Sequence, residues 1–109
     1  MSRFVLVLGL VAALSGTALA QAADFTGRVF DADSKDGLQN LQVKLTPPRQ
    51  VKAPIRIATT DREGGFSFRR LLRGRYLVEV SQGTTLLYRA EVDTTKTSSL
   101  QIPLKRRRD

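Results

Sequence analysis

Alternation of apolar and polar residues predicts that this chain folds into short β-strands. Leu41, Val43 and Leu45 alternate with polar residues, and the same two-residue period recurs along 75–81 and 99–104. Because successive side chains of a strand point to opposite faces, this period gives each strand one apolar face. The predicted strands span 25–30, 41–46, 55–60, 66–68, 75–81, 84–92 and 99–104.

The connections between these segments carry residues that form turns. Residues 31–40 are rich in Asp, and 61–65 read Asp-Arg-Glu-Gly-Gly, whose glycines can take positive φ. Three prolines within 46–54 cannot serve a strand ladder, and Pro103 indicates an edge strand. We therefore predict an all-β, antiparallel sandwich with no helix in the mature chain.

The first 20 residues have the pattern of a secretory signal peptide. Arg3 supplies a positive n-region, 4–14 is an apolar run, and Ala18-Leu19-Ala20 is a cleavage site, although cleavage after Ala22 also fits. The run is shorter than the roughly 20 residues that span a bilayer, which disfavours a membrane anchor. We expect export to the periplasm or the exterior, a domain over 21–104, and a basic tail over 105–109.

The remaining 89 of the 109 residues can form one small domain with a narrow stability margin. Many exported domains of this size are stabilised by disulfides, but this sequence contains no cysteine. Its hydrophobic core must therefore suffice, and we expect Phe68 to belong to it.

The middle of the chain resembles the carboxypeptidase regulatory-like domain. The residues that carry the resemblance are Thr60, Asp61, Gly64, Phe66, Phe68, Leu71, Gly74 and Tyr76. The segment 27–45 is similar to the family's opening hairpin, with Gln39 where the family often has proline and Asn40 where it often has glycine. Asn tolerates the left-handed region, so this turn is expected to form. The resemblance implies a prealbumin-like (transthyretin-like) Greek-key sandwich of about seven strands.

Enzymatic activity is not expected from this composition. The sequence has neither histidine nor cysteine, so it lacks a Ser-His-Asp or Cys-His set and the usual zinc ligands. It also lacks nucleotide-binding glycine motifs. In the family that the chain resembles, a separate metallocarboxypeptidase domain holds the zinc, and the transthyretin-like hydrolases of the same fold rely on histidines. We expect no cofactor.

Asp31, Asp33, Asp36 and Gly37 form the one acidic cluster with some likeness to a calcium loop. The third acid is one residue late, and no glutamate follows at the end of the loop. An Asp-rich β-turn is the favoured interpretation.

Positive charge is the strongest compositional signal. Lys and Arg number 18 against 10 acids, a net charge of +8, which becomes +7 if the leader with Arg3 is removed. If every connection reverses the chain, three loops gather cations at one end of the sandwich. This predicted anion-binding patch comprises Arg49, Lys52, Arg69, Arg70, Arg73 and Lys96. The opposite end would collect the acidic loops and the basic tail.

Three functional classes remain open. The first is a non-catalytic exported module that binds an envelope or extracellular glycan, anionic polymer or protein through its loops, since Arg suits carboxylate and phosphate. A solvated basic surface without a dedicated ligand is equally compatible with the charge. The second is a structural protein that pairs edge strands with a partner or itself, and the third is a transthyretin-like hydrolase.

Nucleic acid is disfavoured as a partner because few aromatics are available for base stacking. The oligomeric state is open. For a sugar platform the only aromatic candidates in the mature chain outside 59–80 are Phe25, Phe30 and Tyr88.

Overall fold

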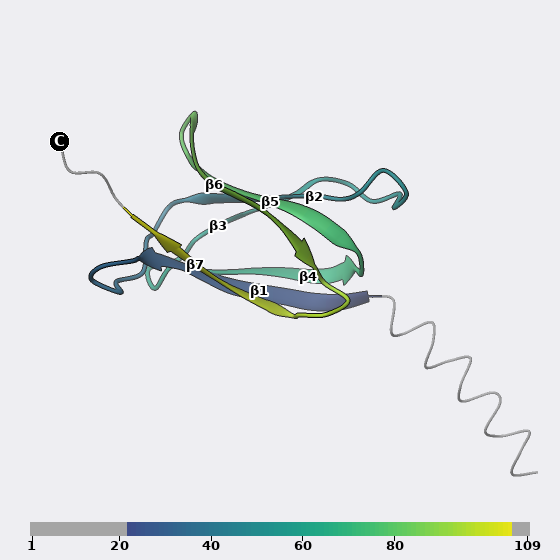
Figure 1. Ribbon diagram of the computed structural model, residues 1–109, viewed down its shortest axis with the longest axis horizontal. Coiled ribbons are helices and arrows are strands. Elements are labelled where there is room, and N and C mark those ends of the chain that lie inside the picture. The colour runs from purple at the N-terminus through teal and green to yellow at the C-terminus, as the bar shows by residue number, and fades with distance from the viewer. Residues whose placement is uncertain (1–21, 106–109) are drawn as a thin grey trace, which may run out of the picture.

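Residues 22–105, the part of the chain that the computed structural model describes, form a two-layered β-sandwich without a helix (Figure 1). The strands are β1 (Ala22–Asp31), β2 (Gln42–Thr46), β3 (Arg56–Thr59), β4 (Gly65–Leu72), β5 (Arg75–Gln82), β6 (Thr85–Asp93) and β7 (Ser99–Leu104). One sheet has the order β4-β1-β7 and the other the order β3-β2-β5-β6. The predicted all-β sandwich of seven strands is confirmed.

One strand pair departs from the predicted antiparallel arrangement. β7 runs parallel to β1, with Thr26 opposite Ser99 and Asp31 opposite Leu104. All other pairs are antiparallel. The chain reaches β7 from the other sheet, through a connection that crosses between the layers, so no tight turn forces these two strands to run in opposite directions. β7 is an edge strand, as Pro103 indicated.

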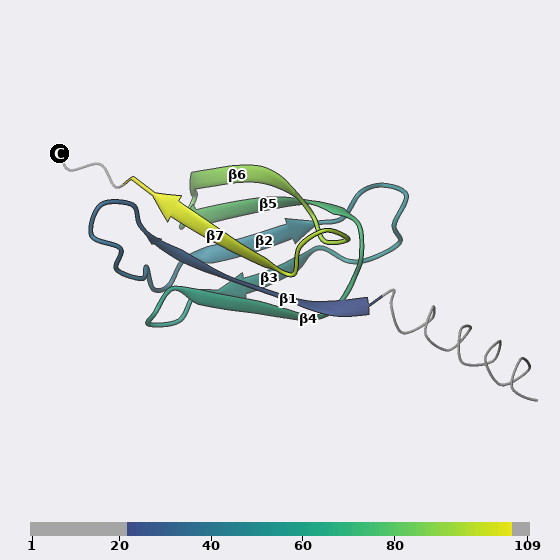
Figure 2. The same cartoon turned by 60° about the horizontal axis from the view of Figure 1, so that its bottom comes forward.

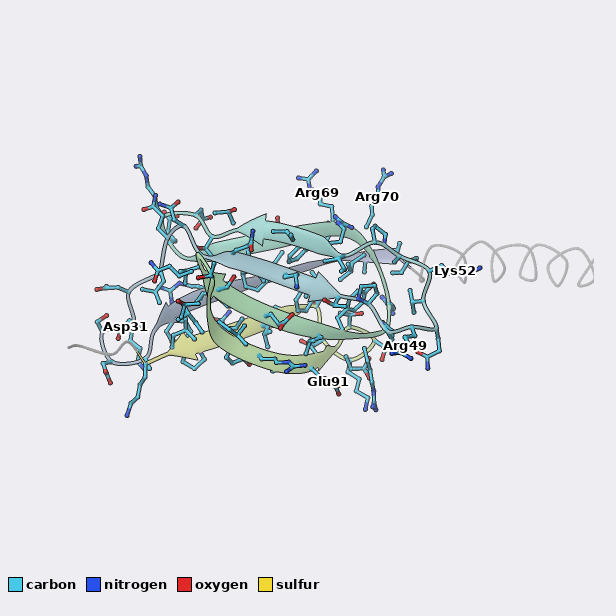
Figure 3. All side chains as sticks on the ribbon, turned by 90° about the horizontal axis from the view of Figure 1, so that it is seen from above. Asp31, Arg49, Lys52, Arg69, Arg70 and Glu91 are labelled. Carbon is cyan, nitrogen blue, oxygen red and sulfur yellow. The ribbon has the colours of Figure 1, made fainter. Side chains whose placement is uncertain are left out.

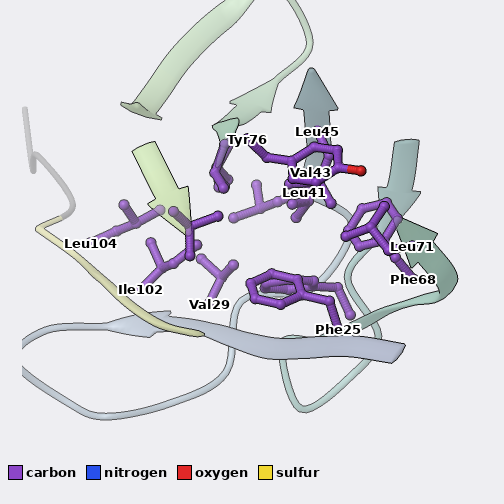
Figure 4. Close-up of a cluster of buried hydrophobic side chains, with 14 residues drawn as sticks. Phe25, Val29, Leu41, Val43, Leu45, Phe68, Leu71, Tyr76, Ile102 and Leu104 are labelled. Carbon is purple, nitrogen blue, oxygen red and sulfur yellow. The ribbon is translucent and has the colours of Figure 1, made fainter. Parts of the chain in front are cut away.

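The space between the sheets is filled by the residues that the alternation marked as apolar. Phe25 and Val29 of β1 face Val43, Leu45 and the β5 residues across the layers (Figure 4). Tyr76, Val78 and Val80 have no exposed surface, and Phe68 is 2% exposed. The buried set is Phe25, Val29, Leu41, Val43, Leu45, Phe66, Phe68, Leu71, Tyr76, Val78, Val80, Val92, Ile102 and Leu104. The expectation that Phe68 lies in the core is confirmed.

The fourth strand is longer than predicted because a β-bulge hides its second half from a simple two-residue period. Phe68 and Leu71 are both buried although they lie three residues apart, since Arg69 and Arg70 together oppose the single residue Asp24. Arg70 has a φ of 53°, and its backbone N–H donates to Asp24 Oδ1 at 3.1 Å. The prediction that Arg69 and Arg70 lie in the loop after the strand is therefore wrong: they lie within β4.

The family-like residues around the β3–β4 turn hold two loops together. The buried Thr60 hydroxyl donates to the Leu38 carbonyl at 2.6 Å and accepts from the Leu41 N–H at 2.9 Å. Asp61 Oδ1 accepts from the N–H of Gly65 at 2.7 Å, closing the turn. Gly64 has a φ of 81°, and a Cβ there would lie 2.0 Å from the Val29 carbonyl oxygen, so only glycine fits.

The segment 27–45 does not form the hairpin that the resemblance implied, because β1 and β2 lie in different sheets and do not pair. The turn expected before β2 nevertheless forms. Asn40 takes a φ of 64°, in the left-handed region that asparagine tolerates. Its N–H donates to the Thr60 carbonyl at 3.0 Å, which joins this turn to the β3–β4 turn.

Connections alternate between the two ends of the sandwich (Figure 2). Loops 47–55, 73–74 and 94–98 lie at the end where β1 begins, which we call the basic end. Loops 32–41, 60–64 and 83–84 lie at the other end, called here the acidic end, together with Lys105 after β7. The predicted leader, residues 1–20, and Arg106–Asp109 of the tail lie outside the described residues. Between residues 22 and 105 no helix has the length and hydropathy needed to cross a membrane.

Candidate anion-binding site

The predicted cations gather towards the basic end of the sandwich. Arg49 and Lys52 lie in the β2–β3 loop, whereas Arg69 and Arg70 project from β4, and Asp31 lies at the far end (Figure 3). Arg73 occupies the β4–β5 turn and Lys96 the β6–β7 loop. The topology thus brings together residues that are separated by up to 47 positions in the sequence.

Most of these cations have no acidic partner. The ion pairs in the described part of the chain are Lys44–Glu79, Arg75–Asp93 and Arg89–Glu79, at 3.7–4.0 Å. Hydrogen bonds from Thr95 lower the pKa of the Asp93 carboxyl, and the positive charges of Lys96 and Arg75 contribute to the same shift. Within residues 22–105 no carboxylate lies within 4.0 Å of a side-chain nitrogen of Arg49, Lys52, Arg69, Arg70 or Arg73.

A small pocket opens between β3 and β4, beside this group of cations. Its volume is about 230 Å³. The lining residues are Lys52, Ala53, Pro54, Arg56, Arg70, Leu71, Leu72 and Tyr76. Two members of the predicted patch, Lys52 and Arg70, therefore line the same pocket. The other four, Arg49, Arg69, Arg73 and Lys96, lie outside it.

Arg56 is the pocket residue that the sequence analysis missed. It pairs with Leu45 and so lies on the inward face of the edge strand β3. Its Nη2 donates to the Arg69 carbonyl at 3.0 Å, and its Cζ lies 6.0 Å from the centre of the Phe68 ring. The sequence did contain a sign of this role, since Arg56 occupies an inward position of a predicted strand. A charged residue at such a position protects the edge of a sheet or points into a site.

Tyr76 forms the inner wall of the pocket. Its hydroxyl donates to the Leu72 carbonyl at 2.6 Å. Burial raises the pKa of the Tyr76 phenol above its ordinary value, and the positive charge of Arg56 opposes that shift. Arg56 and Tyr76 line the same pocket.

The three aromatic candidates, Phe25, Phe30 and Tyr88, do not form a platform on which a sugar could stack. Phe25 is buried in the core, at 1% exposed, and Tyr88 packs against the core. Arg28 and Lys35 lie 5.2 and 5.9 Å from the centre of the Phe30 ring. The exposed pair of flat rings that many sugar sites use is therefore not formed by these three residues.

The acidic end has the geometry of a turn. Asp31 Oδ1 accepts from the N–H groups of Asp33 and Ser34, at 2.8 and 3.1 Å, as an Asp-capped turn requires. Among the residues that the structure describes, no group of three or more His, Cys, Asp or Glu side chains is placed to hold a metal ion.

A wider groove of about 790 Å³ opens at the acidic end, between the β5–β6 hairpin and the end of β7. Leu86 and Leu87 lie on its rim with 52% and 40% of their surface exposed. β6 is an edge strand of its sheet here.

The fold and the motif residues together define a small β-sandwich domain of the regulatory-like type. The model of the carboxypeptidase regulatory-like domain matches residues 24–105, and the chain belongs to that family. No curated protein matches the sequence.

Solved structures share the fold at low sequence identity. The major pilin subunit of Bacillus cereus superposes with a TM-score of 0.59 at 12% identity, over 78% of this chain and 30% of the pilin. A DUF3823 family protein of Parabacteroides merdae has a TM-score of 0.54 at 17% identity, over 77% of this chain and 45% of its own. A candidate carbohydrate-binding protein of Pseudomonas aeruginosa has a TM-score of 0.51 at 18% identity, over 79% of this chain and 89% of its own. These likenesses concern the fold.

Proposed function

We propose that this protein is a non-catalytic, exported module that binds an acidic glycan or a similar anionic polymer through its basic end. The observation that carries the proposal is that Arg49, Lys52, Arg69, Arg70 and Arg73 lie towards one end of the sandwich, without a carboxylate partner in residues 22–105. Grouped cations of this kind attract polyanions and orient them by bidentate contacts. The membership in a regulatory-like domain family and the candidate carbohydrate-binding neighbour support this class of function.

Export is part of the proposal because it decides which polyanions are available. The leader pattern over residues 1–20 supports it. Outside the cytosol, acidic glycans, lipid head groups and acidic protein surfaces are the available partners. The hydrolase alternative gains no support, since the sequence has no histidine or cysteine to serve as its acid, base or nucleophile.

Charge reversal tests the proposal. The triple variant Arg69→Glu, Arg70→Glu and Arg73→Glu should lose retention on an immobilised carboxylated polysaccharide and should no longer capture envelope material. A matched control reverses Lys35, Arg62 and Lys105, which lie at the acidic end, and should retain most of the binding. Unfolding curves of both variants must match the wild type closely enough to show that they fold. Equal retention by the two variants would refute a binding role for the basic end.

A second candidate function is assembly through the edge strand β6, and a specific feature favours it. β6 spans nine residues, pairs on one side only within residues 22–105, and contains the exposed Leu86 and Leu87. The other edges are better protected, because β4 carries its bulge, β3 has four residues, and β7 contains Pro103. Two copies joined through β6 would sediment as a dimer, and Leu86→Lys should disrupt it. A monomer at all concentrations would count against self-pairing.

A further inference from the structure

The pocket between β3 and β4 differs from the rest of the basic end because one of its three cations, Arg56, is held in place by contacts with the fold. Arg56 is anchored to the Arg69 carbonyl and rests against the Phe68 ring. Arg70 enters the same pocket because the bulge displaces it from the alternation of β4. Lys52 joins them from the β2–β3 loop. Lys52 and Arg70 are exposed, as are Arg49 and Arg73, but only Lys52 and Arg70 line the pocket beside the anchored Arg56.

The backbone at Arg70 is the second observation. A φ of 53° places a long, non-glycine side chain in the left-handed region, where glycine would be less strained. Strained positions of this type persist mainly where the side chain has a use. Asp24 accepts from the backbone N–H of Arg70, so it stabilises the bulge without forming an ion pair with the guanidinium.

The pocket walls suit a charged oxygen group. Arg56 uses one of its donors on the Arg69 carbonyl, and the remaining edge of its planar fork is matched in geometry to a carboxylate. The volume of about 230 Å³ is below the usual range for a whole small-molecule ligand. It therefore fits a charged substituent of a longer chain.

We propose that this pocket receives one carboxylate of an acidic glycan, with Arg56 and Arg70 as its direct partners and Lys52 as a third charge at the rim. The inference rests on the proposed function, because it names the group that the basic end recognises. The other cations of the patch then attract the remainder of the polymer through longer-range, salt-sensitive interactions.

Arg70→Gly separates this idea from a general effect of charge. Glycine suits the backbone at this position, so the variant should unfold at the same temperature as the wild type or a higher one. Its affinity for trigalacturonic acid, measured by calorimetry on the purified protein, should nevertheless fall about tenfold or more, as expected for a lost charge-assisted contact. Arg73→Gln removes the same charge three residues away, in the β4–β5 turn outside the pocket, and should lower the affinity by about threefold or less.

Three further arms decide between the interpretations. Methyl-esterified trigalacturonic acid should not bind, because it lacks the carboxylate. Tighter binding of inorganic phosphate than of the uronic acid would overturn the assignment to carboxylate. Equal losses in Arg70→Gly and Arg73→Gln would overturn the pocket and leave the basic end as a diffuse site, whereas no binding of any polyanion by the wild-type protein would refute both proposals.

Discussion

Replacing Thr60 by valine removes a buried clamp while keeping the shape of the side chain. The hydroxyl joins the β1–β2 connection to the β3–β4 turn, through its bonds to the Leu38 carbonyl and the Leu41 N–H. Thr60 is 2% exposed, so water cannot replace these partners freely. Valine has a similar volume, which leaves the cost of the hydrogen bonds as the dominant effect.

The expected loss follows from the two partners. The buried Leu41 N–H left without its acceptor costs about 1–3 kcal/mol, and the half-buried Leu38 carbonyl about 0.5–1 kcal/mol. The added methyl group returns about 0.8 kcal/mol. The net destabilisation is about 1–3 kcal/mol, and each kcal/mol lowers the midpoint of thermal unfolding by about 4–8 °C in a domain of this size.

Urea unfolding and hydrogen exchange of the Leu41 amide measure this loss. Thr60→Ser is the matched control, since it keeps the hydroxyl and should keep the Leu41 amide protected. Anion binding should be unchanged in both variants, because the clamp lies at the acidic end. A Thr60→Val protein with wild-type stability and a protected Leu41 amide would refute the assignment of the clamp.

Four further substitutions test the core and the turns. Phe68→Ala should cost about 3–5 kcal/mol of unfolding free energy by emptying a fully packed site, and an unchanged melting temperature would contradict its place in the core. Gly64→Ala should prevent folding or lower the melting temperature severely, because its Cβ would meet the Val29 carbonyl, whereas Gly74→Ala, whose Cβ has contacts of 3.6 Å or more, should melt near the wild-type temperature. The raised pKa of Tyr76 favours the neutral phenol in the folded state, so stability should be complete below pH ~10 and decline above it as the unfolded chain ionises. Tyr76→Phe should show a shallower alkaline decline in a pH series of melting curves, and an identical decline would exclude this origin.

The sequence predicts the strands well because burial on one face leaves a two-residue period that is local and easy to see. Six of the seven predicted segments agree with the observed strands within a few residues at each end. The fourth predicted strand ends too early, before Arg69 and Arg70. A bulge interrupts the two-residue period in the same way as the end of a strand does, so the sequence pattern does not distinguish them. Leu71, three residues after Phe68, was the only local sign that the strand continues.

The candidate site was predicted in part. Alternating connections suffice to place Arg49, Lys52 and Arg73 at one end, since this requires only that the strands reverse direction. The pocket depends on how the two sheets pack at the β3–β4 edge, and the inward position of Arg56 follows from its pairing with Leu45. The parallel pairing of β1 and β7 is likewise non-local, since no pattern within either segment specifies the direction of its neighbour.

A residue-by-residue binding map tests the central claim most directly. Amide chemical shifts of the isotope-labelled protein would be followed during titration with a uronic acid oligosaccharide. The account predicts that the perturbed amides cluster in 47–56, 69–74 and 94–98, at the basic end of the sandwich. Perturbations confined to the acidic-end loops 32–41 and 60–64, or no perturbation at any residue, would contradict it.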